Sequence, residues 1–412
     1  MTAPANKNAF LFVLVTVTLN MIGFGLIIPV IPQFLEELTG YGPEEAIVWG
    51  GALTATYALM NFLAGPTLGA LSDQYGRRPI LLASIATLVI DFLIMGFATS
   101  LAILFVGRAL AGLSSATFST ANAYVADVTA PEDRGKAFGM IGAAFGVGFI
   151  LGPAIGGLLG DINTRLPFFA AAALGGINFL YGMFVLPESL TPDKRRKLDM
   201  ARANPFGAFK HFSKLPKVSW FLLAVGVFGF AHVVYPATWN FHGEIRYNWT
   251  SSQIGASLAL VGIGAAVVQA GLLGQFIKRI GEVRTALFAL AMGTLSLIGF
   301  AFSSAPWMAY VIIPLSAFGG MAGPAVNAIM SKQTPANAQG ELQGAVSSIQ
   351  SLGMIIGPIV MTQTLHTFSK DDAVISFAGA AFLLAALLTG LSSLVFWRGV
   401  KANRIALKAP DT

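Results

Sequence analysis

The sequence contains no cysteine and few charged residues. Its 412 residues include 25 Lys and Arg, 19 Asp and Glu and 4 His, so charged residues make up only 11% of the chain. An ordinary soluble domain carries about 25%. Without cysteine the chain has no disulfide, no thiolate metal site and no thiol nucleophile. With 55% hydrophobic residues and a mean hydropathy of +0.72, it cannot cover a soluble surface, which excludes a soluble enzyme, a nucleic-acid-binding protein and a disordered chain.

Motifs for covalent chemistry are also missing. The sequence has no phosphate-binding loop of the form GxxxxGK followed by Ser or Thr, no His/Glu cluster with metal-ligand spacing, and no pairing of a nucleophile with a base. We therefore expect no enzymatic activity, no catalytic site, no metal and no cofactor. Energy for any vectorial work must come from an ion gradient, most simply of protons.

Long apolar runs fill most of the chain. A membrane-spanning helix needs about 20 apolar residues, and we predict an all-α integral membrane protein with twelve such helices. Their expected ranges are 8–34, 47–71, 79–98, 101–126, 137–160, 166–187, 218–241, 252–277, 284–304, 307–331, 340–367 and 373–398. The polar, basic connection 188–217 is expected to separate an N-terminal six-helix bundle (1–187) from a C-terminal one (218–412).

Lysine and arginine are distributed unevenly between the two sides of the predicted membrane. The N-terminus, the connections after every second span and the C-terminus hold 21 of them, the opposite side holds three, and Arg108 lies inside a span. Because basic residues mark cytoplasmic loops, both termini and the loop 188–217 are predicted to be cytoplasmic. The basic run 194–197 contributes to this bias and could also bind anionic lipid.

An internal repeat relates the two predicted bundles. Three pairs of motifs share one offset of 205 residues: Gly69-x6-Gly76 with Gly274-x6-Gly281, Gly135-x3-Gly139 with Gly340-x3-Gly344, and Gly152-Pro153 with Gly357-Pro358. Two halves of the same topology, related by an axis along the membrane normal, are typical of transporters whose site lies near the midplane.

Several segments resemble one family of transporters. GALSDQYGRRPI (69–80) resembles the signature loop between the second and third helices of the major facilitator superfamily. RALAGLSSATFS (108–119) and GVGFILGPAIGG (146–157) resemble signatures of its drug:proton antiporter branch with twelve helices. The stretches GFGLIIPVIPQF, YALMNFLAGPTLGALSD, PFFAAAALGGINFL and QGELQGAVSSIQSLGMIIGP resemble the tetracycline efflux proteins. The resemblance covers nearly the whole chain and implies the major facilitator fold, with two pseudo-symmetric six-helix bundles, and drug efflux.

Three positions depart from the tetracycline antiporters. Those proteins carry aspartates in the first and ninth helices, where this chain has Asn20 and Met292, and some carry a histidine in the eighth, where it has Ala265. The missing groups are associated with proton coupling and with the metal–tetracycline complex. We therefore expect tetracycline to be a poor substrate.

Charged residues flank the glycine turn at residue 76. The simpler interpretation is a solvated loop that helps to set topology. The resemblance implies instead a latch of the outward-facing state, comprising Gly69, Asp73, Gly76, Arg77, Arg78 and Asp127. An aspartate at position 73 would then lie beside the N-terminus of the eleventh helix, where negative charge is favourable. In the second half the equivalents of Asp73 and Arg77 are Lys278 and Glu282.

Two charges lie within predicted spans, Asp91 in 79–98 and Arg108 in 101–126. Intramembrane charges are costly and usually functional. A short hairpin joins the two spans, so both charges are expected about 10 Å below the outer surface. They form either a structural ion pair or a coupling site, in which protonation of Asp91 or release of Arg108 couples proton movement to transport. His232 is a further intramembrane titratable group, either a packing residue or a proton site.

Small, amide and aromatic residues complete the candidate sites. The fifth span carries a packing motif of Gly148, Gly152, Pro153, Gly156 and Gly157. Polar candidates for a substrate cavity are Asn20, Asn61, Asn122, Gln269, Asn327, Gln343 and Gln350. Apolar candidates are Phe24, Phe145, Phe149, Phe230, Trp239, Met321 and Met354. Any one aromatic or Met is better explained by packing or lipid contact, but the set suggests a large apolar pocket for an amphipathic molecule.

The sequence thus predicts a proton-coupled exporter of small amphipathic compounds in the cell's inner membrane. We expect it to interact with a small-molecule substrate, protons and membrane lipid, to bind no nucleic acid, and to act as a monomer. An importer or facilitator of a metabolite, such as an organic acid or a lipid precursor, is the alternative within transport. A receptor or scaffold on the same fold is the alternative outside it.

Overall fold

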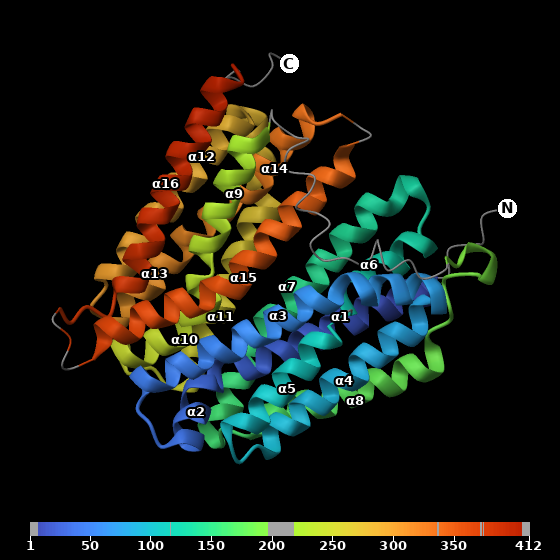
Figure 1. The fold of residues 1–412 in the computed structure, drawn as a ribbon, viewed down its shortest axis with the longest axis horizontal. Helices are drawn as coiled ribbons and strands as arrows, with labels where there is room; N and C mark the ends of the chain where they lie inside the picture. The colour runs from blue at the N-terminus through green and yellow to red at the C-terminus, as the bar shows by residue number, and fades with distance from the viewer. Residues whose placement is uncertain are drawn as a thin grey trace. The chain divides into compact units, whose positions relative to one another are not determined.

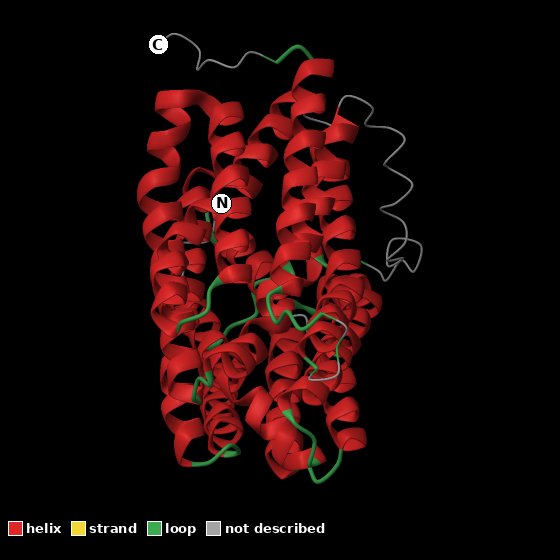
Figure 2. Ribbon diagram, turned by 90° about the vertical axis from the view of Figure 1, so that its left-hand side faces the viewer, coloured by secondary structure: helices red, strands yellow, loops and turns green. Residues whose placement is uncertain are grey.

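The computed structural model describes residues 7–115, 117–196, 218–335, 338–370, 373 and 375–405. Across these residues the chain is helical and contains no β-strand (Figure 2). In a hydrocarbon layer each backbone N–H and C=O must be hydrogen-bonded within the protein, and a helix does this locally. The expectation of an all-α membrane protein is confirmed.

The helices of the first half lie close to the predicted spans (Figure 1). They are α1 (Lys7–Ile27), α2 (Ile31–Thr39), α3 (Pro43–Tyr75), α4 (Arg77–Phe97), α5 (Leu101–Leu113), α6 (Thr117–Val128), α7 (Arg134–Ile162) and α8 (Leu166–Val185). The fourth predicted span is interrupted, because α5 ends at Leu113 and α6 begins at Thr117.

The second half repeats this arrangement with its own irregularities. Its helices are α9 (Ser219–His232), α10 (Val234–Tyr247), α11 (Ser251–Ala266), α12 (Leu273–Phe302), α13 (Pro306–Ser316), α14 (Ala322–Gln333), α15 (Gln339–Ser369) and α16 (Ala380–Ala402). A π-helical segment, Val267–Leu272, follows α11, and a 3₁₀ segment, Ala317–Met321, joins α13 to α14. The predicted start of the last span at residue 373 is wrong. Phe377 donates its N–H to the carbonyl oxygen of Phe368 at 2.7 Å, and α16 begins only at Ala380.

Among the described residues, ten helical segments are long and apolar enough to cross a membrane. One of them, Ser251–Phe302, has 52 residues and contains Gly281 with non-helical dihedral angles, so it supplies two spans. The interrupted pair α5 and α6 supplies one more. These segments fit the twelve predicted spans.

The described helices group into two units. Unit 1 lies within Met1–Gly40, Thr56–Pro205 and Thr250–Ala259, and unit 2 lies within Tyr41–Ala55, Phe206–Trp249 and Leu260–Thr412. In unit 1, α1 packs against α7 and α8, and α4 packs against α8 and α5. In unit 2, α16 packs against α9 and α12, and α15 packs against α10 and α9. The expected domain limits at 187 and 218 remain predictions, since residues 197–217 lie outside the described part.

Two short segments belong to the unit formed mainly by the other half of the sequence. Thr250–Ala259 joins unit 1, where Ser251 Oγ donates to Gln33 Oε1 at 2.9 Å and Ser252 N–H donates to Asp161 Oδ1 at 3.2 Å. Tyr41–Ala55 joins unit 2, where a Cβ at Gly51 would lie 2.9 Å from Cγ2 of Thr362. Each of these two segments thus has specific contacts within the unit that it joins.

Candidate functional site

The turn between α3 and α4 is built around Gly76. Its φ of 110° is a conformation that residues with side chains rarely adopt. A single residue therefore joins the two helices. This places Asp73, in the last turn of α3, next to Arg77, the first residue of α4.

Arg77 contacts two carboxylates. Its Nη1 lies 2.6 Å from Oδ1 of Asp73, and its Nε donates to Oδ2 of Asp127 at 3.1 Å. Nη1 also donates to Oγ of Ser72 at 3.0 Å. The Arg77 side chain is only 12% exposed, so water screens these charge-assisted hydrogen bonds less than it screens surface pairs. The structure brings together three of the residues predicted to form the latch.

Arg78 and Gly69 are placed differently. Nη2 of Arg78 donates to the carbonyl oxygen of Met183 at 2.6 Å, so Arg78 binds the end of α8. A Cβ at Gly69 would meet no heavy atom within 4 Å, so packing in this structure does not require a glycine there. The expected position of Asp73 beside the eleventh helix remains a prediction.

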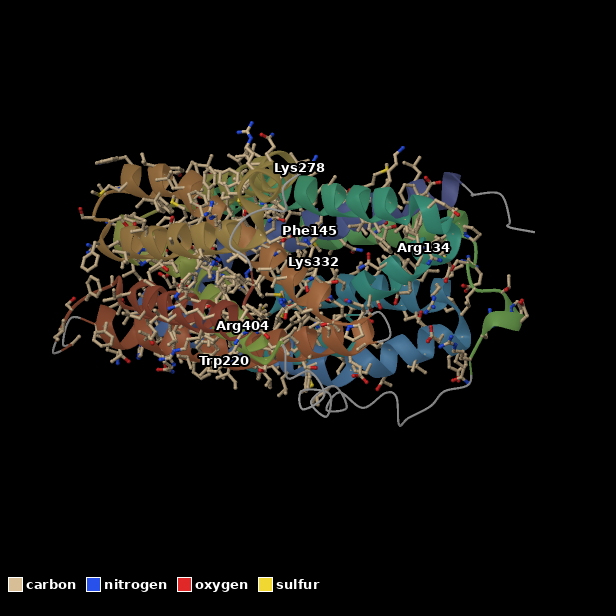
Figure 3. All side chains as sticks on the ribbon, turned by 90° about the horizontal axis from the view of Figure 1, so that it is seen from above. Arg134, Phe145, Trp220, Lys278, Lys332 and Arg404 are labelled. Carbon is tan, nitrogen blue, oxygen red and sulfur yellow. The ribbon has the colours of Figure 1, made fainter. Side chains whose placement is uncertain are left out.

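The equivalent turn in unit 2 has a similar backbone and opposite charges. Gly281 has φ 82° and ψ 163°, close to the φ of 110° and ψ of 161° at Gly76. Glu282 takes the place of Arg77, and its carboxylate pairs with Lys332 (labelled in Figure 3). The Lys332 side chain is 65% exposed, and such pairs contribute about 1 kcal/mol or less. The second turn therefore has an inverted and weaker version of the ion pair.

Asp91 on α4 and Arg108 on α5 form an ion pair in the interior of unit 1. The Asp91 side chain is fully buried, and that of Arg108 is 10% exposed. The guanidinium carbon of Arg108 lies 6.0 Å from the ring centroid of Tyr57, at the outer limit of a cation–π contact. Gly107 leaves room for the carboxylate, because a Cβ there would lie 2.9 Å from Asp91 Oδ1.

The ion pair leaves part of its hydrogen-bonding capacity unused. Oδ1 of Asp91 and Nε of Arg108 are buried without a hydrogen-bond partner, as are Nδ2 of Asn20 and Oγ1 of Thr120. Unpaired buried polar atoms are costly and rare in folded proteins. The unused capacity fits a pair that meets water, or exchanges partners, during function.

His232 on α9 is held mainly by packing. Its Nδ1 donates to the carbonyl oxygen of Phe228 at 3.2 Å, and the two ring centroids are 3.9 Å apart. The ring centroid of Tyr235 lies 5.6 Å away. Donation by Nδ1 leaves Nε2 as the acceptor in the neutral ring. A role for His232 in proton transfer remains a prediction.

The predicted cavity residues differ in exposure. Trp239 and Met321 are 3% and 0% exposed, and they pack in the interior of unit 2, with the ring centroid of Trp239 4.9 Å from that of Phe300. They present almost no surface to a ligand, in contrast to the prediction. Asn20 is 6% exposed. The candidates with exposed or partly exposed side chains are Phe24, Asn61, Asn122, Phe145, Phe149, Phe230, Gln269, Asn327, Gln343, Gln350 and Met354.

Some of these candidates contact one another. Phe145 and Phe149 stack on α7 with ring centroids 6.3 Å apart (Phe145 is labelled in Figure 3). In unit 2, Nε2 of Gln343 donates to Oδ1 of Asn327 at 3.3 Å. Gln269 lies in the π-helical segment Val267–Leu272, a distortion that is frequent at functional sites. The candidates thus include an aromatic surface on unit 1 and amide groups on unit 2.

The glycine motif of α7 packs closely within unit 1. Its five residues Gly148, Gly152, Pro153, Gly156 and Gly157 are all buried. A Cβ at Gly152 would lie 2.7 Å from the carbonyl oxygen of Ile22 on α1, and one at Gly157 would lie 2.9 Å from Cα of Ser252. Close helix packing alone therefore requires these glycines.

Glu188 is a residue that the sequence interpretation missed. It follows α8, and its carboxylate accepts the backbone N–H of Arg77 at 2.8 Å. A signal was present, because a carboxylate at the C-terminal end of a helix is unfavourable for that helix. The position of Glu188 therefore indicates that its carboxylate binds a group outside α8, but the sequence does not identify which helix supplies that group.

A family model matches most of the chain. The model described as the Major Facilitator Superfamily matches residues 13–358 and 247–408. The chain belongs to the Major Facilitator Superfamily.

Proteins named for drug resistance are similar to this Major Facilitator Superfamily chain over most of its length. "Tetracycline resistance protein, class C" of Escherichia coli is 40% identical over 383 residues, which cover 93% of this chain and 96% of that protein. The class B protein of Escherichia coli is 35% identical over 381 residues, covering 92% and 94%. "Multidrug resistance protein 2" of Bacillus subtilis is 29% identical over 413 residues, covering 97% and 98%.

Solved transporter structures share the superfamily fold. The crystal structure of the nucleoside transporter NupG matches 96% of this chain and 99% of that chain, with a TM-score of 0.77 at 14% identity. The human organic anion transporter MFSD10 matches 96% and 100%, with a TM-score of 0.70 at 21% identity. These similarities establish the fold, and the chain is a multi-pass membrane protein.

Proposed function

We propose that this protein is a proton-coupled secondary transporter that exports small amphipathic, drug-like compounds across the cell's inner membrane. Its similarity to proteins named for tetracycline and multidrug resistance supports export of drugs. The observation that carries the coupling is the buried pair of Asp91 and Arg108, because a carboxylate inside a membrane helix is costly unless it serves a function.

The coupling step follows from the geometry of that pair. While Arg108 holds Asp91, the carboxylate stays charged, because the opposite charge stabilises the ionised form. If Arg108 turns toward substrate or water, Asp91 becomes an isolated buried carboxylate and takes up a proton. Since the two conformations then differ in protonation, a proton gradient biases the direction of transport. His232 is the next candidate for the proton site.

The latch controls which side is open. Arg77, Asp73 and Asp127 belong to three helices of unit 1, so their contacts change whenever these helices move. An interaction present in only one conformation shifts the equilibrium toward that conformation. The latch residues are therefore expected to affect turnover far more than substrate affinity.

The orientation of the chain completes the proposal. Both termini and the loop 188–217 lie in the cytoplasm in this proposal, and the excess of Lys and Arg on that side supports this orientation. The chain acts as a monomer surrounded by lipid and catalyses no covalent reaction. Its substrate contacts the aromatic surface near Phe145 and Phe149 on unit 1.

A transport panel tests the function. Everted membrane vesicles that contain the protein are loaded with structurally different amphipathic compounds, with and without an imposed proton gradient. Cells that express it are tested in parallel for drug susceptibility. The proposal predicts gradient-dependent accumulation in everted vesicles, abolished by a protonophore, and reduced susceptibility of the cells. Gradient-independent equilibration, or accumulation of a metabolite in right-side-out vesicles only, would support a facilitator or an importer instead.

A further inference from the structure

The carboxylate of Glu188 accepts four backbone N–H groups. Oε1 accepts from Arg77 at 2.8 Å, and also from Ser189 and Leu190 at 3.0 Å each. Oε2 accepts from Arg78 at 3.2 Å. One side chain at the end of α8 therefore binds the first two residues of α4.

The N-terminus of α4 favours such a partner. The first N–H groups of a helix have no acceptor within the helix, and they carry a partial positive charge. No side chain of the residue before the helix can cap them, because that residue is Gly76. Glu188 supplies the missing acceptor from a distant part of the sequence.

Gly76 is matched to this carboxylate. A Cβ at position 76 would lie 2.7 Å from Cδ of Glu188. The residue must be glycine because of its positive φ and also because the carboxylate occupies the space beside it. The turn and Glu188 therefore form one packed arrangement.

The residues beside Glu188 contact the same region. Oη of Tyr124 on α6 donates to the carbonyl oxygen of Pro187 at 3.0 Å. Oγ of Ser189 donates to Oδ2 of Asp127 at 3.2 Å, the oxygen that also accepts from Arg77. The segment 187–189 thus connects the end of α8 to both α4 and α6.

The repeat shows that the fold itself does not require the carboxylate. Glu188 lies three residues beyond the end of α8, and the residue at the same distance beyond the end of α16 is Ile405, which has no carboxylate and packs against the hydrophobic core of unit 2. The turn at Gly281 nevertheless has a similar backbone. A glycine turn of this kind therefore forms without an acidic residue from the last helix of its bundle.

We propose that Glu188 is a positioning residue of the latch. By binding the first N–H groups of α4, it fixes the direction in which the Arg77 side chain leaves the helix, toward Asp73 and Asp127. The role in transport rests on the proposed function, whereas the effect on the first turn of α4 does not. Loss of the carboxylate loosens that turn and lowers the rate of conformational exchange, with little effect on substrate affinity.

Purified full-length protein tests the positioning by hydrogen exchange. In Glu188→Gln, where an amide N–H replaces one acceptor oxygen, the amides of Arg77 and Arg78 should exchange about tenfold faster, because each loses a hydrogen bond to a charged group. The amides that follow Gly281 should be unchanged and serve as the internal control. Unchanged exchange at Arg77 and Arg78 would overturn the proposal, even if no transported compound has been found.

A transport measurement tests whether Glu188 acts through Arg77. Glu188→Gln should lower turnover about tenfold at unchanged KM, Glu188→Asp should recover part of it, and exposed Glu132→Gln should behave like wild type. In an Arg77→Ala background, Glu188→Gln should cause no further loss. A raised KM, or a full second loss in that background, would show that Glu188 does not act through Arg77. Absence of gradient-driven transport by the wild type would count against the proposed function alone, since the exchange measurement is independent of it.

Discussion

The carboxylate of Asp91 pairs with the guanidinium of Arg108 where α4 and α5 pack together inside unit 1. Within the part of the chain that the structure describes, neither residue forms another ion pair, and Asp91 has no exposed surface. Each residue therefore depends on the other for its charge to be tolerated. In the proposed coupling step, this dependence is what lets a movement of Arg108 change the protonation of Asp91.

Removal of Arg108 should be harmful to both folding and transport. Arg108→Ala leaves a buried carboxylate without its partner, which costs about 3–5 kcal/mol. We expect a lower thermal unfolding temperature in detergent and impaired downhill and gradient-driven transport. Lys332→Ala is the matched control, because it breaks an exposed ion pair worth about 1 kcal/mol or less. Equal unfolding temperatures for the two variants would contradict the account of the buried pair.

The latch should govern turnover. Asp73→Asn and Arg77→Ala remove charge-assisted hydrogen bonds that are worth about 1.5–3 kcal/mol, so we expect turnover to fall at least about tenfold. Binding of substrate should change little, because these residues act on the conformational equilibrium. Glu282→Gln, at the equivalent exposed pair of unit 2, should have a smaller effect. Wild-type turnover in Asp73→Asn would remove the latch from the mechanism.

Membrane orientation can be measured directly, because the chain has no native cysteine. Thr191→Cys, in the loop after α8, should be protected from an impermeant thiol reagent in intact cells and should react in everted vesicles. Ser100→Cys, between α4 and α5, should show the opposite pattern. Ser189, in the same loop, is a less suitable position for the cysteine, because its hydroxyl donates a hydrogen bond to Asp127. Labelling of Thr191→Cys from outside intact cells would reverse the proposed topology.

Tetracycline should be a poor substrate of the wild type. Asn20 and Met292 are uncharged and cannot neutralise a cationic metal–drug complex. Expression of the protein should therefore raise tolerance to tetracycline less than tolerance to other amphipathic drugs. The variant carrying Asn20→Asp and Met292→Asp should transport tetracycline better than the wild type. Strong uptake of tetracycline by wild-type everted vesicles would show that these two acids are dispensable.

Local sequence patterns predict the helices and the ion pair. Apolar runs of sufficient length fixed most spans within a few residues, since only helices satisfy the backbone in lipid. The pairing of Asp91 with Arg108 could be expected because a short hairpin places both charges at one depth. The repeated glycine at residues 76 and 281 predicted two similar turns, which the dihedral angles bear out.

Contacts between distant segments were not predictable in the same way. Glu188 reaches α4 across 111 residues of sequence, and no local pattern specifies that contact. Trp239 looked like a cavity residue because its helix was expected to line one, yet its ring faces the interior of unit 2. Which face of an apolar helix is buried depends on its neighbours, and an almost uniformly apolar sequence carries little signal for it.

The most direct test of the account is proton-driven transport by Asp91→Asn in proteoliposomes. Wild-type and variant protein are reconstituted with a transported compound at two imposed pH gradients, and downhill exchange is measured without a gradient. The account predicts that Asp91→Asn retains some exchange but accumulates no substrate at either gradient, because Asn cannot change its protonation. Accumulation equal to the wild type at both gradients would contradict it. Asp91 would then be only the structural partner of Arg108.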